Sequence, residues 1–208
     1  MSDYRRTPLC PKRGDVKQKK ELLEIEIRSS GRITTQNMYA YVSDRNGEFN
    51  HKFIEAYDSR CSYCGCSVDI LPRTLFEIDH YFPESKFNNK PEAGKMSNIV
   101  LACRKCNGAK SNSTDDTYDE KMHPYRDEIL EIFCRDEMFK IAITETHKDN
   151  VSVRSFYDAL KLYEQTRRLD YLLVYLHAYI NILDKSTERY TVLLGAFEML
   201  RQKRNYVL

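Results

Sequence analysis

The sequence contains no apolar run long enough to cross a membrane, and residues 1–20 lack the apolar stretch of a signal peptide. We therefore expect a cytoplasmic protein with no membrane partner. No internal repeat is visible, and with 208 residues the chain is too long for a disulfide-held mini-protein. The formal net charge is only +2, which taken alone argues against a nucleic-acid partner.

The charge is unevenly distributed, however. Residues 1–20 hold seven Lys or Arg against two Asp, and residues 113–139 hold nine Asp or Glu against three Lys or Arg. Local basic clusters, and not the total charge, set the attraction to phosphate. Residues 100–112 contain three basic side chains and no acidic one, so we predict nucleic-acid contacts there. These side chains are Arg104, Lys105 and Lys110. For the basic N-terminal segment, a solvated surface is an equally good interpretation.

Seven cysteines are present, and four of them form two pairs with two residues between the members. Without an export signal, paired thiols indicate metal ligands and not disulfides. Four thiolates in two such turns are the usual ligand set of a closed tetrahedral zinc site. We therefore predict that structural Zn²⁺ is bound by Cys61, Cys64, Cys103 and Cys106. Cys66 is a spare thiol that could exchange with a ligand, although the spacing favours Cys61 and Cys64. Cys10 and Cys134 have no role beyond free thiols.

The hydrophobic pattern indicates an α+β protein that is mostly helical. A strand, a loop, a second strand and a helix form the expected metal-binding core. The predicted helices cover 15–29, 36–41, 49–57, 127–133, 153–163, 166–183 and 187–204, with one more from about 104, and the predicted strands cover 75–80, 98–102 and 138–144. The expected segments are a flexible basic arm over 1–14, N-terminal helices over 15–57, the core over 58–125 and a C-terminal helical region over 126–208.

The segment between the two cysteine pairs contains an Asp-His step and two asparagines. Hydrolysis of a phosphodiester needs a base whose pKa is near the operating pH, and a divalent cation to neutralise charge on the phosphate. Asp79 and His80 are adjacent in an expected strand and face opposite sides, so one can bind metal while the other activates water. The amide oxygen of Asn107 is a hard ligand suited to Mg²⁺ or Mn²⁺. Asn98 can pin the loop between the strands and orient the imidazole.

Together these residues resemble the HNH endonucleases of the His-Me finger class. The similarity lies in Asp79-His80 with Pro83, in Asn98-Ile99-Val100-Leu101 and in Asn107-Gly108-Ala109-Lys110, framed by the two cysteine pairs. It covers about 50 residues and implies a ββα-metal core stapled by zinc. It also implies His80 as general base, Asp79 and Asn107 as ligands of catalytic Mg²⁺ or Mn²⁺, and Asn98 as the central structural asparagine. Lys110 matches a basic position that faces phosphate.

A weaker resemblance extends outside this motif. The basic arm, the zinc centre, the His123-Pro124-Tyr125 step and the run Arg167-Arg168-Leu169-Asp170-Tyr171 are similar to the nuclease subunits of Septu-type antiphage systems, which also accompany some retrons. That resemblance implies DNA or RNA as substrate and an ABC-type ATPase subunit as partner. In a retron it implies a reverse transcriptase with its DNA as well. The chain has no Walker A pattern, so the ATPase would be another chain.

Two other functions fit parts of the same pattern. The first is a zinc-dependent scaffold that binds nucleic acid or a partner but leaves it uncut, although such a module has no need of Asp79, His80 and Asn107 together. The second is a restriction or mobile-element nuclease that acts alone. A co-purifying ATPase would separate this last function from a defence nuclease.

Overall fold

The structure is a computed structural model that describes residues 3–9, 15–31, 33–110 and 117–206. Its fold is mostly helical, as predicted from the sequence, with two small antiparallel sheets, β1 with β2 and β3 with β4. The described helices are α1 (Val16–Ser29), α2 (Met38–Val42), α3 (Glu48–Ala56), α4 (Lys90–Ala93), α5 (Arg104–Lys110), α6 (Glu128–Ile132), α7 (Val151–Ala159), α8 (Gln165–Asn181) and α9 (Glu188–Tyr206). The strands are β1 (Phe76–His80), β2 (Ile99–Cys103), β3 (Phe133–Arg135) and β4 (Ile141–Ile143). Over the described ranges, no helix is both long and apolar enough to cross a membrane.

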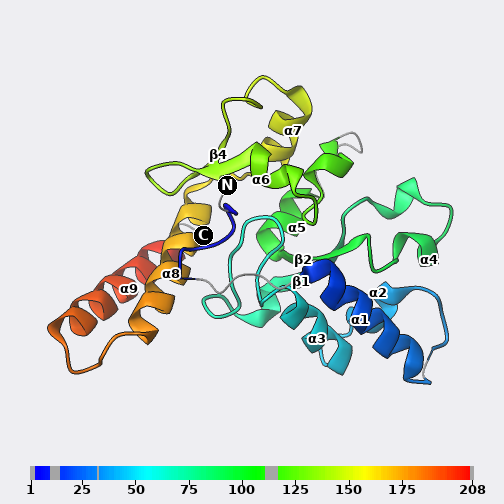
Figure 1. The fold of residues 1–208 in the computed structure, drawn as a ribbon, viewed down its shortest axis with the longest axis horizontal. Coiled ribbons are helices and arrows are strands. Elements are labelled where there is room, and N and C mark those ends of the chain that lie inside the picture. Colours follow the sequence, from blue (N-terminus) through cyan, green and yellow to red (C-terminus); the bar gives the residue numbers. More distant parts are fainter. Residues whose placement is uncertain (1–2, 10–14, 32, 111–116, 207–208) are drawn as a thin grey trace.

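The hairpin of β1 and β2 lies at the centre of the molecule, with α5 directly after β2 (Figure 1). Its register pairs Asp79 with Val100 and His80 with Ile99. All five residues of β2 are buried, which explains why the short apolar run was recognisable in the sequence. The two expected strands of this hairpin are confirmed to within about a residue at each end, and so is the expected start of the helix near 104.

The N-terminal helices pack beside this hairpin. Asp15 caps α1 by accepting from the backbone N–H of Gln18 at 3.1 Å, and Leu23 and Ile27 lie on its buried face. Lys20 is also on that face and is only 3% exposed. Its ammonium donates to the carbonyl of Ile99 at 2.6 Å, so α1 is tied to β2 through a buried cation.

Several boundaries differ from the predictions, because local contacts override the sequence pattern. Asn37, and not a threonine, caps α2 by accepting from the N–H of Tyr39. The strand predicted over 138–144 shortens to β4, because Phe139 has a φ of 62° and belongs to the preceding turn. Asn150 caps α7 in place of Ser152, and the helix ends at Ala159. Helix α4 and strand β3 were not predicted, since each has fewer than five residues.

Part of the expected flexible arm packs into the core, because Tyr4, Arg5 and Thr7 are buried, while Pro8 and Leu9 are exposed. Tyr4 is 1% exposed, and its hydroxyl donates to the carbonyl of Tyr63 at 2.7 Å. The Arg5 guanidinium donates to the carbonyl of Ser62 at 2.9 Å. The remainder of the expected arm, including Cys10, lies outside the described residues.

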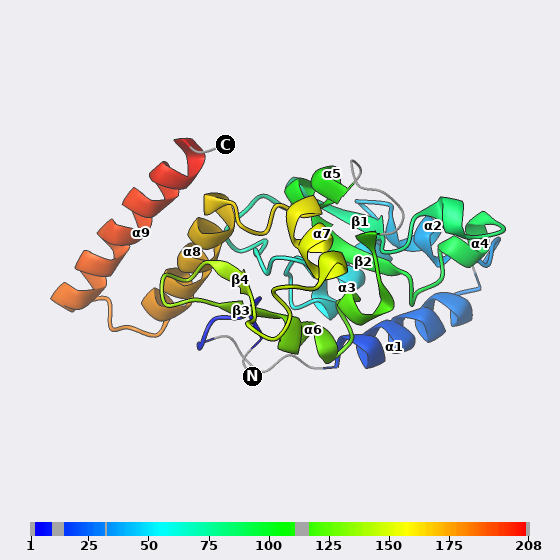
Figure 2. The ribbon, with the colours of Figure 1, turned by 90° about the horizontal axis from the view of Figure 1, so that it is seen from above.

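The last two helices, α8 and α9, form a hairpin that extends away from the rest of the molecule (Figures 1 and 2). Both helices were predicted, with ends that differ by one to two residues. Only Arg204 is fully buried on α9. Its Nε donates to the Asp170 carboxylate on α8 at 2.8 Å, so a buried ion pair holds the two helices together.

Candidate active site and metal centre

The β1–β2 hairpin and α5 position the predicted catalytic side chains. Neighbouring residues of a strand point to opposite faces, so Glu77 and Asp79 share the face that meets α5. On α5, Asn107 and Lys110 are one turn apart and meet these two carboxylates. His80 points to the other face of the strand, toward α2.

Asp79 is held by two groups. Its two carboxylate oxygens each lie 2.9 Å from Nζ of Lys110, and the Tyr63 hydroxyl donates to it at 2.7 Å. Lys110 also donates to the backbone carbonyl of His80. Burial lowers the pKa of Lys110, and the neighbouring Asp79 carboxylate opposes that shift. Lys110 was expected to face phosphate, but its ammonium is buried against Asp79.

His80 is half-enclosed between an aromatic ring and a carboxylate. Its ring stacks on Tyr39, with the ring centroids 4.5 Å apart and the planes at 25°. Its Nε2 is buried, makes no hydrogen bond within the described residues, and lies 3.8 Å from a carboxylate oxygen of Glu84. Burial lowers the pKa of His80 from its ordinary 6.5, against the opposite effect of Glu84. The imidazole is therefore neutral near pH 7, the form that a general base requires.

Asn98 fixes the loop that follows β1. Its side-chain oxygen accepts from the N–H of Phe82 at 2.9 Å, and its side-chain nitrogen donates to the carbonyls of Phe82 at 3.0 Å and Ala93 at 2.8 Å. Its backbone carbonyl accepts from the N–H of Tyr81 at 2.7 Å. Both the oxygen and the nitrogen of the side-chain amide thus bond to the backbone of Phe82, two residues after His80.

Asn107 lies over the first acidic residue of β1. Its side-chain nitrogen donates to Glu77 at 2.8 Å, which leaves the amide oxygen as an acceptor. Asn107 and Asp79 therefore share the interface of α5 with β1. Over the residues described, no hydrogen bond joins either of them to the ring of His80, which approaches from the opposite face.

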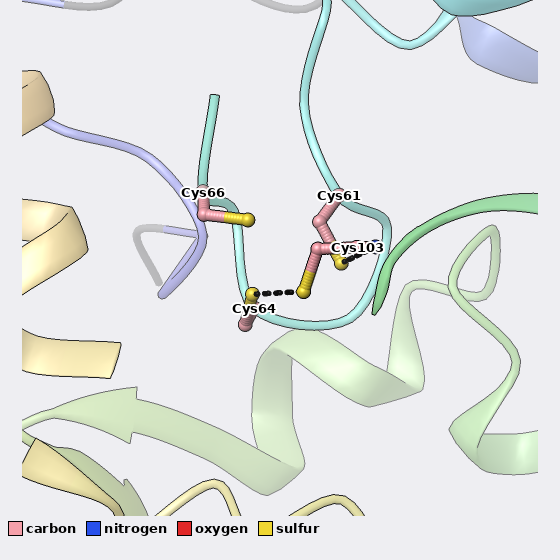
Figure 3. A group of neighbouring side chains, drawn as sticks. All are labelled: Cys61, Cys64, Cys66 and Cys103. Carbon is pink, nitrogen blue, oxygen red and sulfur yellow. Dashed lines mark hydrogen bonds between the residues drawn. The ribbon is translucent and has the colours of Figure 1, made fainter. Parts of the chain in front are cut away.

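Four cysteines form a buried cluster beside the hairpin (Figure 3). The sulfur atoms of Cys61, Cys64, Cys66 and Cys103 all lie within 4.8 Å of one another. The Cys64 and Cys103 sulfurs are 3.8 Å apart, and the backbone N–H of Cys103 donates to the Cys61 sulfur. Close, buried thiols that receive a backbone N–H suit a thiophilic divalent ion such as zinc.

The cluster adds a candidate, Cys66, to the predicted ligand set. Cys66, described from the sequence as a spare thiol, belongs to the group of mutually close sulfurs. Gly65 has a φ of 78°, and this left-handed turn folds Cys66 back so that its carbonyl accepts from the N–H of Cys61 at 2.9 Å. Cys106 is also fully buried, and burial raises the pKa of its thiol, as do the neighbouring thiols of Cys103 and Cys61. Five thiols thus surround a site that needs four, with Cys66 and Cys106 as alternatives for the fourth position.

Of the other predicted nucleic-acid contacts, only Arg104 is exposed. Lys105 donates to the Thr166 hydroxyl at 3.1 Å and lies 3.6 Å from the Glu164 carboxylate, so it contacts the C-terminal region.

Sequence reasoning missed several residues that contact the predicted site. Glu77 had a usable signal, because it is two residues before Asp79 and must share its face. Tyr39 and Tyr63 gave no such signal, since each approaches through tertiary packing from a distant segment.

The comparisons with known proteins agree with this geometry. Residues 61–113 match the HNH endonuclease family model. The match begins at the first cysteine of the cluster and includes both strands of the hairpin and all of α5. Searches of curated proteins and of solved structures found no significant match. The HNH domain is therefore supported by the family model, the buried thiol cluster and the strand–strand–helix order together.

Proposed function

We propose that this protein is a metal-dependent HNH endonuclease that hydrolyses phosphodiester bonds of DNA or RNA. The observation that carries the proposal is the family match over 61–113, which contains Asp79, His80 and Asn107 on the hairpin and α5. Nucleic-acid binding follows from the same match, because a nuclease must hold its substrate.

In this proposal each side chain has a distinct task. The neutral imidazole of His80 takes a proton from water as that water attacks phosphorus, and stacking on Tyr39 fixes the direction in which the ring points. Asp79 and the amide oxygen of Asn107 would hold Mg²⁺ or Mn²⁺, which supplies charge neutralisation at the phosphate when bound. Asn98 positions His80 by fixing the backbone of Tyr81 and Phe82.

Lys110 competes with a divalent cation for the Asp79 carboxylate. Its ammonium occupies both carboxylate oxygens, so a divalent cation must compete with it or displace it toward the substrate. A displaced ammonium would be available to a phosphate oxygen, which reconciles its burial here with the phosphate contact expected from the sequence.

The test is cleavage of end-labelled DNA and RNA by zinc-loaded protein, with and without added Mg²⁺ or Mn²⁺. Removing a general base costs about 100-fold or more in rate, and we expect that loss for His80→Ala. His147→Ala is the matched control, because His147 lies in the loop between β4 and α7 and its ring Nδ1 lies within hydrogen-bond distance of the hydroxyls of Thr144 and Thr146. Cleavage that survives in His80→Ala without a divalent ion would refute the proposal. Binding without cleavage by the wild type would favour the scaffold function instead.

We further propose that the nuclease works in phage defence with an ABC-type ATPase subunit, and in some settings with a retron. Helix α9 supports a protein partner, because its Val192 and Met199 are 61% and 72% exposed and lie two turns apart on one side. Co-purification of the tagged chain from its native host tests this role. A stable ATPase in the eluate supports it, and a nuclease that cuts alone and elutes alone supports a restriction or mobile-element enzyme.

A further inference from the structure

Arg167 on α8 is the largest fully buried side chain of the described molecule, with 2% of its surface exposed. Its Nη1 lies 3.6 Å from the sulfur of Cys103 and 3.7 Å from that of Cys64. Its Nη2 donates to the carbonyl of Leu160 at 3.0 Å, and its Nε has no partner within the described residues. The guanidinium thus points into the thiol cluster from outside the matched HNH domain.

This arginine differs from the two other fully buried arginines in the described part of the chain. Arg5 and Arg204 each have an aspartate at 2.8 Å, Asp3 and Asp170 respectively. For Arg167, no carboxylate lies within 4.0 Å among the residues that the structure describes. A buried guanidinium without an anion is strongly destabilising, so the chain must supply negative charge in another form.

The thiol cluster supplies that charge in full when it holds a metal. Zinc binding deprotonates its cysteines, and a divalent ion with four thiolates leaves a net negative charge on the cluster. Neutral thiols offer Arg167 no such charge. Metal binding and the burial of Arg167 therefore favour each other.

We propose that Arg167 is the counter-charge of the metal-loaded thiolate cluster, and that it couples docking of the α8–α9 hairpin to metal occupancy. Arg167 stands near the start of α8, and Asp170, one turn later, holds Arg204 of α9. Loading the cluster thus stabilises the attachment of the whole hairpin. The inference concerns zinc retention and holds whether or not the HNH centre cuts nucleic acid.

The experiment follows zinc release from the full-length, zinc-loaded protein to an excess of a chromogenic chelator. In Arg167→Met the neutral chain cannot balance the thiolates, and we expect release to accelerate about 10-fold to 100-fold, the usual cost of losing a contact to a metal ligand. Arg168→Met is the matched control, because Arg168 is the next residue and its Nε donates to the carbonyl of Met138, an exposed residue, and not to the cluster. It should release zinc at the wild-type rate.

A second measurement separates this role from simple packing. We compare the thermal unfolding midpoint with zinc and after chelation, for wild type, Arg167→Met and Arg167→Lys. Because coupling is reciprocal, zinc should raise the midpoint less in Arg167→Met than in wild type. Arg167→Lys keeps a charge but cannot reach two sulfurs and a carbonyl together, so it should fall between them even if the methionine variant fails to fold. Equal zinc-dependent shifts in wild type and the lysine variant, or wild-type zinc release by a folded methionine variant, would overturn the proposal.

Discussion

Lys110 supplies a buried positive charge to the Asp79 carboxylate. It neutralises Asp79 with both side chains only 8% exposed. Breaking a buried ion pair by removing one partner costs about 3–5 kcal/mol, because the remaining charge is left uncompensated. The cost should shrink when another cation can take the vacant place.

We therefore expect Lys110→Met to be destabilised in metal-free buffer and to regain part of that loss when Mg²⁺ is added to zinc-loaded protein. Wild type should gain less from Mg²⁺, because Lys110 already occupies the carboxylate. The measurement is the urea midpoint with and without Mg²⁺. Lys148→Met, which removes an exposed pair with Glu145, is the control and should respond like wild type. The same Mg²⁺ response in all three proteins would mean that Asp79 does not bind the ion.

Buried His123 makes the stability of the fold depend on pH. Burial, reinforced by the nearby Lys20 ammonium, lowers its pKa from 6.5 to about 3. The folded state therefore binds fewer protons than the unfolded chain between these values, and stability falls as the pH falls through that window. One such group contributes a slope of about 1.4 kcal/mol per pH unit at most.

The variant His123→Gln removes this proton linkage. Its free energy of unfolding, relative to wild type, should improve steadily as the pH falls from 6.5 toward 4. Denaturant titrations at several pH values measure the difference in unfolding free energy between the variant and wild type. Because both proteins share the zinc site, its own pH dependence cancels in this difference. His147→Gln should keep the wild-type slope. A constant difference between His123→Gln and wild type across this range would show that His123 does not remain neutral in the fold.

At the scale of elements, the sequence predicted those parts whose signal is local. The buried apolar run of β2 and the cysteine spacing placed the hairpin and α5 correctly. The sequence left Cys66 as a thiol that could exchange with a ligand, because its position in the cluster depends on the left-handed backbone of Gly65 and not on spacing. The burial of Lys110 and the stacking of Tyr39 could not be predicted. Both depend on how distant helices and strands pack against one another, which the local sequence pattern does not reveal.

The turn at Gly65 should not tolerate a side chain. A Cβ at this position would lie 2.2 Å from the backbone oxygen of Arg5, and its φ of 78° disfavours any side chain. We expect Gly65→Ala to lose about 1–3 kcal/mol of stability and to release zinc faster, because the turn also carries Cys66. Gly195→Ala on α9 meets nothing within 4 Å and should instead gain about 0.5–1 kcal/mol. Urea unfolding of both variants checks the opposite signs, and a neutral Gly65→Ala would mean that the turn relaxes freely.

At the scale of the whole molecule, the α8–α9 hairpin is joined to the HNH domain by few strong contacts. Arg167 attaches α8 to the thiol cluster, and Asp170 with Arg204 attaches α9 to α8. Burial raises the pKa of Asp170 to about 6, although Arg204 acts to lower it. The raised value means that the folded state binds a proton more tightly than the unfolded chain. This group therefore costs stability as the pH rises from about 4 through 6.

Removing Arg204 should make stability depend more steeply on pH. In Arg204→Met the Asp170 carboxylate has lost its ion pair, so its pKa rises further and the variant is least stable where the carboxylate must ionise. We expect the loss relative to wild type to be about 3–5 kcal/mol near pH 8 and clearly smaller near pH 5, where the buried group can take up a proton. The double variant Asp170→Leu with Arg204→Met replaces the pair by apolar side chains and should recover stability at pH 8, since no charge is left buried. Urea unfolding at both pH values measures the effect. Equal losses by Arg204→Met at the two pH values would show that packing of the arginine stem, and not its charge, attaches α9 to the molecule.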